Sequence, residues 1–265
     1  MKLKNIISSI AAIGFTAAIA MPAQAGYVVL DGWELKTPTT DTTNIGRMNL
    51  VSGTAIVEQE LNSSGNVFVG AEFVENGSIY SISYTAENVV GGGDIGGPQF
   101  FGSFPSVIGL TINFSNVAGH VTALSSTGGF EYVFDSGNFT IASSDGGTSS
   151  GSIVGLGGTA ASTANFAGTN GDSSLLALIL SSSGLNYYDN AGNDLAADMA
   201  TGDVAFLAVT NNNITAIGSG ACSFASDGDA AVGCVMLNAT SAGDAYLAQI
   251  PEPATLALLG LGFLG

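Results

Sequence analysis

Short runs of Val, Ile, Phe, Tyr and Thr, each closed by Gly, Asn, Asp or Ser, fill this chain and restrict it to a β fold. Between residue 27 and about residue 248 the sequence has almost no helical periodicity. Runs such as Val67–Val74, Ile79–Thr85 and Phe130–Phe134 have the composition of strands. Alternation is clearest in SIYSISYT, where Tyr80, Ile82 and Tyr84 share one face and Ile79, Ser81 and Ser83 share the other. We expect the first of these faces to be buried and the serines to face water.

More than a dozen such runs predict a single all-β domain over residues 26–249, of the β-sandwich or jelly-roll type. A parallel β-solenoid is disfavoured because the runs repeat with no fixed period. Long Gly-rich loops are expected between the strands. The main one is Gly91–Pro105, whose Phe100, Phe101 and Phe104 either plug one end of the sandwich or form a ligand platform. One short helix is expected at Leu195–Met199, capped by Asp194.

Residues 1–25 have the three parts of a secretory signal peptide. Lys2 and Lys4 supply a basic start, Ile6–Met21 is apolar, and Ala23-Gln24-Ala25 is a small-residue cleavage site. We therefore expect cleavage between Ala25 and Gly26, and export of the mature chain.

The last sixteen residues, IPEPATLALLGLGFLG, predict a stiff spacer followed by an apolar helix. Pro251 and Pro253 fix the backbone and lack a donor N–H, and every later side chain except Thr255 is small or apolar. The apolar run of about twelve residues is shorter than the ~20 that span a bilayer. A C-terminal strand is the alternative, although two prolines and Gly-Leu-Gly disfavour it.

The triplet Pro251-Glu252-Pro253, followed by this apolar run, resembles the PEP-CTERM sorting signal of exopolysaccharide-producing Gram-negative bacteria. The resemblance implies that residues 250–265 enter the inner membrane transiently through a helix and are processed by a membrane protease, exosortase. It also implies delivery to the cell surface or the extracellular matrix. In that signal a basic cluster follows the helix. The chain stops at Gly265 without one, so we expect either a truncated sequence or a defective anchor.

The mature chain is strongly acidic. Removal of the signal peptide leaves Lys36 and Arg47 against 21 Asp and Glu residues, a net charge of −19. Such a surface repels nucleic acids and anionic lipid headgroups, and attracts divalent cations and cationic polymers. Nucleic acid is therefore not an expected partner. Most of the polarity comes from Ser, Thr, Asn and Gly, which suits a carbohydrate-rich environment.

Cys222 and Cys234 both lie in the exported part, where an oxidising environment favours a disulfide. They enclose eleven residues, and closing a loop of that size contributes on the order of 3 kcal/mol of stability by chain entropy. A metal site is the alternative. It would need two more soft ligands, and the one histidine, His120, is remote in sequence.

Calcium is the cofactor that the acidic loops suit best, because it prefers hard oxygen ligands. The candidate ligands are Asp189 and Asp194 in DNAGND, and Asp227 and Asp229 in SDGDA. Neither string follows the EF-hand order, and turn chemistry alone also explains Asp, Asn and Gly in such positions.

The sequence contains no recognisable catalytic motif: no G-x-S-x-G, no H-E-x-x-H, no phosphate loop and no cofactor fingerprint. A Ser-His-Asp triad would have to use His120, which lies in a strand-like run. Glu58 and Glu60 are two residues apart on one predicted strand, too close to flank a sugar from opposite sides. We therefore expect a non-enzymatic protein.

The first half of the mature chain is similar to the flocculation-associated subgroup of PEP-CTERM proteins. The similarity lies in GWELKTP at Gly32–Pro38, TNIGRMNLVSG at Thr43–Gly53 and SYTAENVVGGGDIG at Ser83–Gly96. It implies a non-catalytic role in cell aggregation, as flocs or biofilm, within an exopolysaccharide matrix. The alternatives are a carbohydrate-binding module that recognises a glycan through Trp33, Tyr187 and Tyr188, and a secreted hydrolase.

Overall fold

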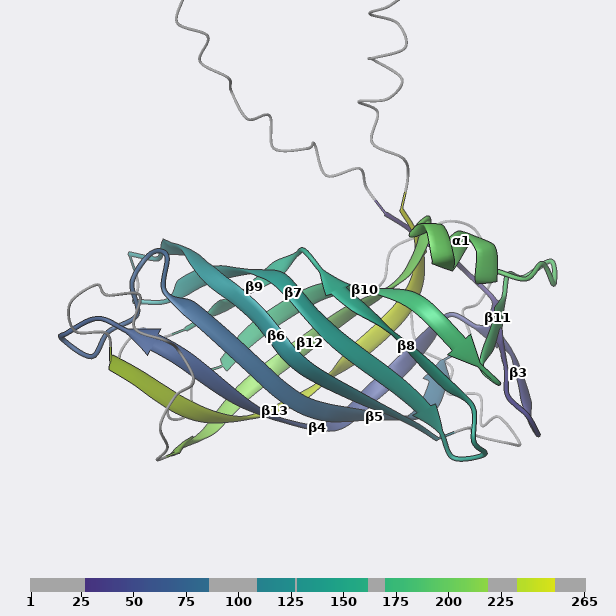
Figure 1. Cartoon of the computed structure of the whole chain (residues 1–265), viewed down its shortest axis with the longest axis horizontal. Helices are drawn as coiled ribbons and strands as arrows, with labels where there is room; N and C mark the ends of the chain where they lie inside the picture. The colour runs from purple at the N-terminus through teal and green to yellow at the C-terminus, as the bar shows by residue number, and fades with distance from the viewer. Residues whose placement is uncertain (1–26, 86–108, 127, 162–169, 219–232, 251–265) are drawn as a thin grey trace, which may run out of the picture. The chain divides into compact units, whose positions relative to one another are not determined.

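Eight antiparallel strands close into a barrel in the computed structural model of the chain (Figure 1). The structure describes residues 27–85, 109–126, 128–161, 170–218 and 233–250. Each barrel strand pairs with its neighbours in chain order, and the last strand pairs with the first. The barrel strands are β4 (Arg47–Leu61), β5 (Glu72–Thr85), β6 (Leu110–Leu124), β7 (Phe130–Ser143), β8 (Thr148–Val154), β10 (Asn170–Ser183), β12 (Val204–Gly218) and β13 (Gly233–Gln249).

The all-β prediction is confirmed, but the predicted β-sandwich or jelly-roll architecture is wrong. The pairing of β13 with β4 runs from Gly233 opposite Leu61 to Ala245 opposite Met48, so the sheet closes on itself. The alternation of apolar and polar residues shows only that each strand buries one face. That pattern is the same whether the buried face meets a second sheet or the interior of a closed one. The contact that distinguishes the two folds joins strands at opposite ends of the chain.

Two short strands extend this framework. β9 (Gly157–Ala160) continues beyond β8 between the same two neighbours, β7 and β10, after a kink at Gly155 and Leu156 with φ of +59° and +61°. β8 and β9 therefore occupy one interrupted position in the barrel. β1 (Val28–Val29) pairs with the end of β13.

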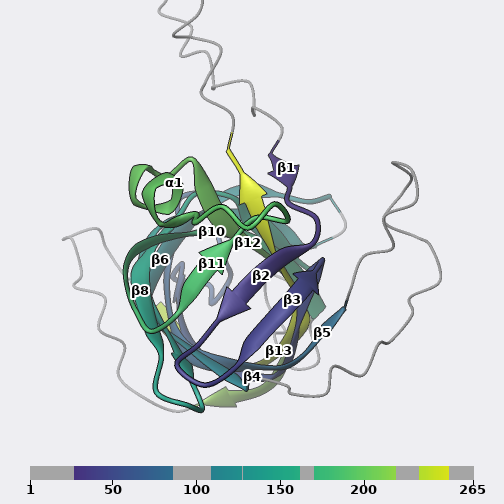
Figure 2. The same cartoon turned by 90° about the vertical axis from the view of Figure 1, so that its right-hand side faces the viewer.

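A separate three-stranded sheet lies across one end of the barrel (Figure 2). It consists of β2 (Trp33–Lys36), β3 (Asp41–Ile45) and β11 (Asn186–Tyr188). Trp33, Leu35 and Ile45 are completely buried. The Trp33 ring packs edge-on against Phe206 of β12, with the ring centroids 6.1 Å apart. The small sheet thus closes this end of the barrel with apolar side chains.

Asp145 joins the β2–β3 turn to the β7–β8 turn. One carboxylate oxygen accepts hydrogen bonds from the Thr37 hydroxyl, from the Thr39 hydroxyl at 2.8 Å and from the Thr39 amide at 3.2 Å. The other accepts one from the Ser143 hydroxyl at 2.6 Å. Desolvation raises the pKa of Asp145, but the bonds from Ser143, Thr37 and Thr39 together hold this pKa below its usual range.

The predicted helix is confirmed as α1 (Ala196–Thr201), one residue later than expected at its start. The N-cap position is Leu195 and not the predicted Asp194. Asp194, one residue earlier, accepts a hydrogen bond from the Ala196 amide at 2.9 Å. Within the described ranges, no helix has the length and apolar character needed to cross a bilayer. The expected C-terminal helix and the Gly91–Pro105 loop lie outside the described residues.

The predicted faces of Ile79–Thr85 are partly wrong. Ile79 and Ser81 point into the barrel and are 6% and 0% exposed, whereas Tyr80 is 41% exposed on the outside. Tyr84 is nevertheless buried. Shifts in the register between β4 and β5 accompany this change, one of them between Asn49 and Leu50. A bulge moves later side chains to the other face, which a strict two-residue period does not anticipate.

Candidate functional site

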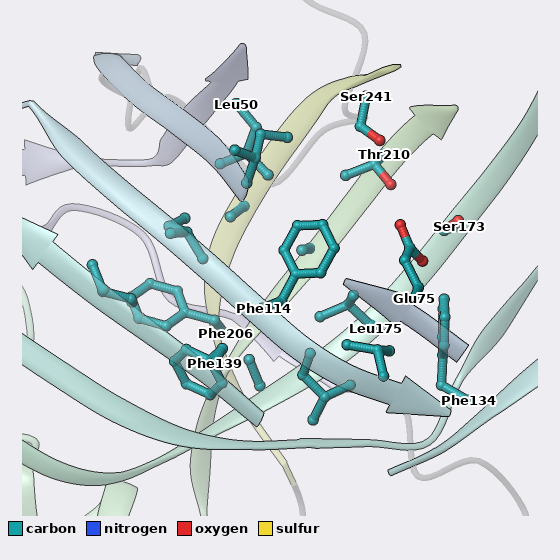
Figure 3. Close-up of a pocket in the computed structure, with 18 of the residues that line it drawn as sticks. Leu50, Glu75, Phe114, Phe134, Phe139, Ser173, Leu175, Phe206, Thr210 and Ser241 are labelled. Atoms are coloured by element: carbon teal, nitrogen blue, oxygen red, sulfur yellow. The ribbon is translucent and has the colours of Figure 1, made fainter. Parts of the chain in front are cut away.

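Among the described residues, one carboxyl group faces the barrel interior, that of Glu75 in an otherwise apolar stretch of β5. Its neighbours on the same face, Phe73 and Ile79, are core residues. The Glu75 side chain lines the cavity drawn in Figure 3. Gly77 lies between Glu75 and Ile79, where a Cβ atom would clash with the Thr54 carbonyl oxygen and come within 2.6 Å of the Phe114 ring. A glycine here allows Phe114 to pack against β5 beside Glu75.

Two adjoining cavities fill the middle of the barrel, with volumes of about 90 Å³ and about 80 Å³. A single water molecule needs on the order of 10–15 Å³ of such space, so each cavity has room for several waters or a small ligand. Glu75 and Asn212 line both cavities. The remaining lining is mainly apolar, and Figure 3 shows Phe139 and Phe206 on the side opposite the polar residues.

A hydrogen-bonded group of side chains lies next to Glu75. Tyr132 and Ser173 share a hydrogen bond of 2.7 Å between their hydroxyl oxygens. The Asn212 amide donates to the Ser173 hydroxyl, and its carbonyl oxygen accepts bonds from Ser241 and Thr210. The five residues come from four strands, β7, β10, β12 and β13, and form one connected group, which we call the lumen network. Its members use their polar atoms mainly on one another.

Burial changes the proton affinity of two groups in the lumen. Desolvation raises the pKa of Glu75 to about 7, because the charged carboxylate loses its hydration in the barrel. Desolvation also raises the pKa of Tyr132 to about 12, with a smaller contribution from the charge of Glu75. Tyr132 is therefore neutral at physiological pH, whereas Glu75 changes its charge near neutrality. An apolar pocket with a few convergent polar groups and a perturbed carboxyl has the features of a binding site.

The outer surface carries a different feature, a row of hydroxyl and amide side chains. Eight register partners, one from each barrel strand, are all Ser, Thr or Asn, and all are exposed or half-exposed. We call them the outer belt: Asn213, Thr240, Thr54, Ser78, Asn113, Thr140, Ser150 and Ser181. Because neighbouring strands lie about 4.8 Å apart, the belt presents hydrogen-bonding groups at regular intervals around the barrel.

The aromatic residues proposed for glycan recognition do not form an exposed platform. Trp33 is 0% exposed and Tyr187 is 3% exposed, and their rings pack together in the core. Tyr188 is half-buried, and the Lys36 ammonium lies 4.3 Å from the centre of its ring. Two of the three predicted sugar-stacking rings are therefore unavailable to a ligand.

The described calcium candidates have local roles. One oxygen of Asp189 accepts bonds from the Ala191 and Asn193 amides, at 2.9 and 2.8 Å, and the other accepts one from the Asn193 side chain. The hydrogen bond from the Asn193 side chain is the main cause that lowers the pKa of Asp189. Asp194 precedes α1, as described above. Among the described residues, no three Asp, Glu, His or Cys side chains gather as a metal site. Asp227 and Asp229 lie outside these residues.

His120 lies on the outer surface, where its Nδ1 is 2.8 Å from an Asp135 carboxylate oxygen. In the part of the chain that the structure describes, no serine hydroxyl hydrogen-bonds to this ring. Cys234 is the second residue of β13 and lies opposite Glu60. Its predicted partner Cys222 lies outside the described ranges, as do Ala25, Gly26 and the triplet Pro251, Glu252 and Pro253. The disulfide and the signal cleavage point therefore stay predictions.

Comparison with known proteins identifies the C-terminal segment. The PEP-CTERM protein-sorting motif matches residues 249–265, which confirms the predicted sorting signal. No curated protein and no solved structure matches the chain. The motif marks the chain as an exported protein that is processed by an exosortase and sorted to the cell envelope.

Sequence reasoning missed the lumen site. Glu75 lies in VENGS, where Asn76-Gly77 is a typical turn signal, so the sequence predicts a turn between two strands at this point. In the structure it is the middle of β5, with a bulge against β6 between Glu75 and Gly77. The even spacing of Phe73, Glu75 and Ile79 is the signal that places Glu75 on the inner face.

Proposed function

We propose that this protein is a non-catalytic component of the extracellular matrix, which supports cell aggregation in flocs or biofilm by contacting exopolysaccharide. The sorting motif accounts for delivery to the envelope. The observation that carries the matrix role is the outer belt, in which all eight barrel strands place a Ser, Thr or Asn in one register row.

Polysaccharides are recognised through hydroxyl groups, which both donate and accept hydrogen bonds. Ser, Thr and Asn side chains do the same without carrying a charge. The mature chain has a net charge of −19, but the belt itself contains no acidic residue. An acidic polysaccharide could therefore contact the belt residues without meeting a negative charge among them. Each single contact would be weak, and many contacts along one polymer chain would act together.

The belt can be tested by removing hydroxyls and keeping side-chain shape. The test variant combines Thr54→Val, Thr140→Val and Thr240→Val. Valine is close in shape to threonine and favours strands, so the barrel should fold. The matched control combines Thr111→Val, Thr148→Val and Thr215→Val, which are also on the barrel strands and outside the belt.

Both variants would be introduced into a strain that lacks the gene. Deletion should reduce aggregation and polymer retention, and the control variant should restore both. The belt variant should be exported normally and restore them only partly. It should also sediment less with purified exopolysaccharide. Equal performance of the two variants would show that the belt has no special role.

A carbohydrate-binding module remains the alternative function, but without the Trp33 and Tyr187 platform. Saturable binding of the purified protein to one oligosaccharide on a glycan array would favour the module over a distributed contact with polymer. A non-enzymatic protein also predicts that incubation with the exopolysaccharide releases no oligosaccharide.

A further inference from the structure

Within the described part of the chain, the Glu75 carboxyl has no partner inside the barrel. Among the described residues, no side chain donates a hydrogen bond to it and no cation pairs with it. The described residues that line the two cavities include no Lys, Arg or His. Lys36 is at the small sheet, 3.7 Å from Glu34, and Arg47 pairs with Asp244 at 3.1 Å. Glu75 is half-buried, and a carboxylate that loses hydration without compensation is costly, so this position calls for a donor from outside the chain.

The lumen network does not supply that donor. The Tyr132, Ser173 and Asn212 polar groups bond to one another, and Ser241 and Thr210 donate to Asn212. The network instead forms a polar wall beside the carboxyl. Beyond it, both cavities continue along apolar side chains, including Ile112 and Phe139 in one and Phe130 and Leu237 in the other.

The chemistry of this pocket selects among ligand classes. An anion would meet Glu75 with no compensating cation. A neutral alcohol could donate one hydrogen bond and would leave the charge unpaired. A primary ammonium group supplies both a positive charge and three donors. A second charge on the ligand would have to be buried among apolar residues, which disfavours diamines.

We propose that the barrel lumen binds a small amphipathic monoamine, with its ammonium group on Glu75 and its apolar chain along the cavity wall. The two cavities, of about 90 and 80 Å³, accommodate a chain of a few carbon atoms. This site is independent of the outer belt, because its residues point to the opposite face of the sheet.

Binding should depend on pH through one group. Tyr132 is the other titratable side chain among the cavity-lining residues, and it stays neutral because its pKa is about 12. Glu75 becomes charged as the pH rises through about 7. An alkylamine stays protonated to about pH 10, as a lysine does. The affinity for the amine should therefore increase between pH 5.5 and pH 8.5.

The test is isothermal titration calorimetry of the purified mature protein with hexylamine, 1-hexanol and hexanoate, which share a chain and differ in the head group. We expect saturable binding of one hexylamine, weaker binding of hexanol and no binding of hexanoate. Glu75→Gln should weaken hexylamine binding on the order of 30-fold or more and abolish its pH dependence. Hexanol binding should change little.

Glu131→Gln is the matched control, because it removes one negative charge from an exposed position on β7. It should bind hexylamine as the unmodified protein does. Thermal unfolding of each variant establishes that it is folded. The proposal is overturned if hexylamine does not bind, if Glu75→Gln binds it as tightly as the unmodified protein, or if Glu131→Gln weakens it equally. The last result would indicate a general attraction to the acidic surface.

Discussion

Val28 and Gln249 are antiparallel register partners, so the start of the mature domain lies beside the first residue of the sorting motif. Gln249 also faces Val204 of β12, and the Ile250 amide donates to the Asp203 carbonyl oxygen at 2.8 Å. The barrel therefore holds the chain up to the residue before Pro251. A proline cannot donate to a ladder, which makes this a natural end for β13.

The first prediction concerns this boundary. Replacing Pro251, Glu252 and Pro253 with alanine should leave the free energy of unfolding of the mature domain unchanged, because the last described contact of β13 with the barrel, from the Ile250 amide to the Asp203 carbonyl oxygen, precedes them. It should change the distribution of the protein between membrane, medium and matrix, because processing needs a stiff, extended peptide. Fractionation and immunoblotting measure this. An unchanged distribution would show that the triplet is not required for sorting.

The second prediction uses Trp33, the single tryptophan of the chain. Because it is completely buried, its fluorescence should be blue-shifted and poorly quenched by acrylamide, and added oligosaccharides should leave it unchanged. Trp33→Ala should lower the free energy of unfolding by about 3–5 kcal/mol. Tyr188→Ala, at a half-buried position of the same sheet, should cost much less. Strong quenching in the folded protein would contradict the closure of this end of the barrel by the small sheet.

Local sequence was a good guide to strands and a poor one to their closure. Most predicted runs lie in observed strands, and the helix predicted at Leu195–Met199 is α1, which starts one residue later. The β13–β4 pairing could not be predicted, because it depends on how far eight twisted strands turn and not on any one of them.

The inner site was hidden for a related reason. Asn76-Gly77 signals a turn in isolation, but a bulge in β6 opposite Asn76 and the packing of Phe114 over Gly77 accommodate both residues in a strand. Tertiary contacts determined the local structure there. The buried positions of Trp33 and Tyr187 likewise follow from the small sheet, whose strand β11 comes from far along the chain.

The third prediction concerns Asp145, whose pKa is held below its usual range by bonds from Ser143, Thr37 and Thr39 in spite of desolvation. A depressed pKa stabilises the folded protein at pH values above the unfolded pKa of about 3.9, and this contribution is lost as the pH falls towards the folded value. Asp145→Asn should therefore cost about 1–2 kcal/mol at pH 7 and progressively less below about pH 4. Urea titrations across this range measure it, with exposed Glu131→Gln as the control.

The fourth prediction is the disulfide between Cys222 and Cys234. Mass spectrometry of the exported protein without reductant should find the two peptides linked, because export removes the reducing pool. Reduction should lower the free energy of unfolding by on the order of 3 kcal/mol. Two alkylatable thiols in the unreduced protein would exclude the bond.

The last prediction tests the lumen without any ligand. Burial raises the pKa of Glu75 from 4.5 to about 7. Between these values the folded protein holds a proton that the unfolded chain has released, so stability falls as the pH rises through this window and levels off above it. The lost stability amounts to at most about 3 kcal/mol.

Glu75→Gln removes the titration and keeps the shape of the side chain. Its free energy of unfolding should be close to that of the unmodified protein at pH 4, where Glu75 is mostly protonated in both the folded and unfolded states, and larger at pH 8 by up to about 3 kcal/mol. Urea titrations at the two pH values give the difference, and effects of other carboxyls cancel because both proteins share them. Glu131→Gln should show no such change. A stability difference that is the same at pH 4 and pH 8 would mean that Glu75 titrates as an ordinary carboxyl, and the lumen would then lack the uncompensated charge that an amine is proposed to neutralise.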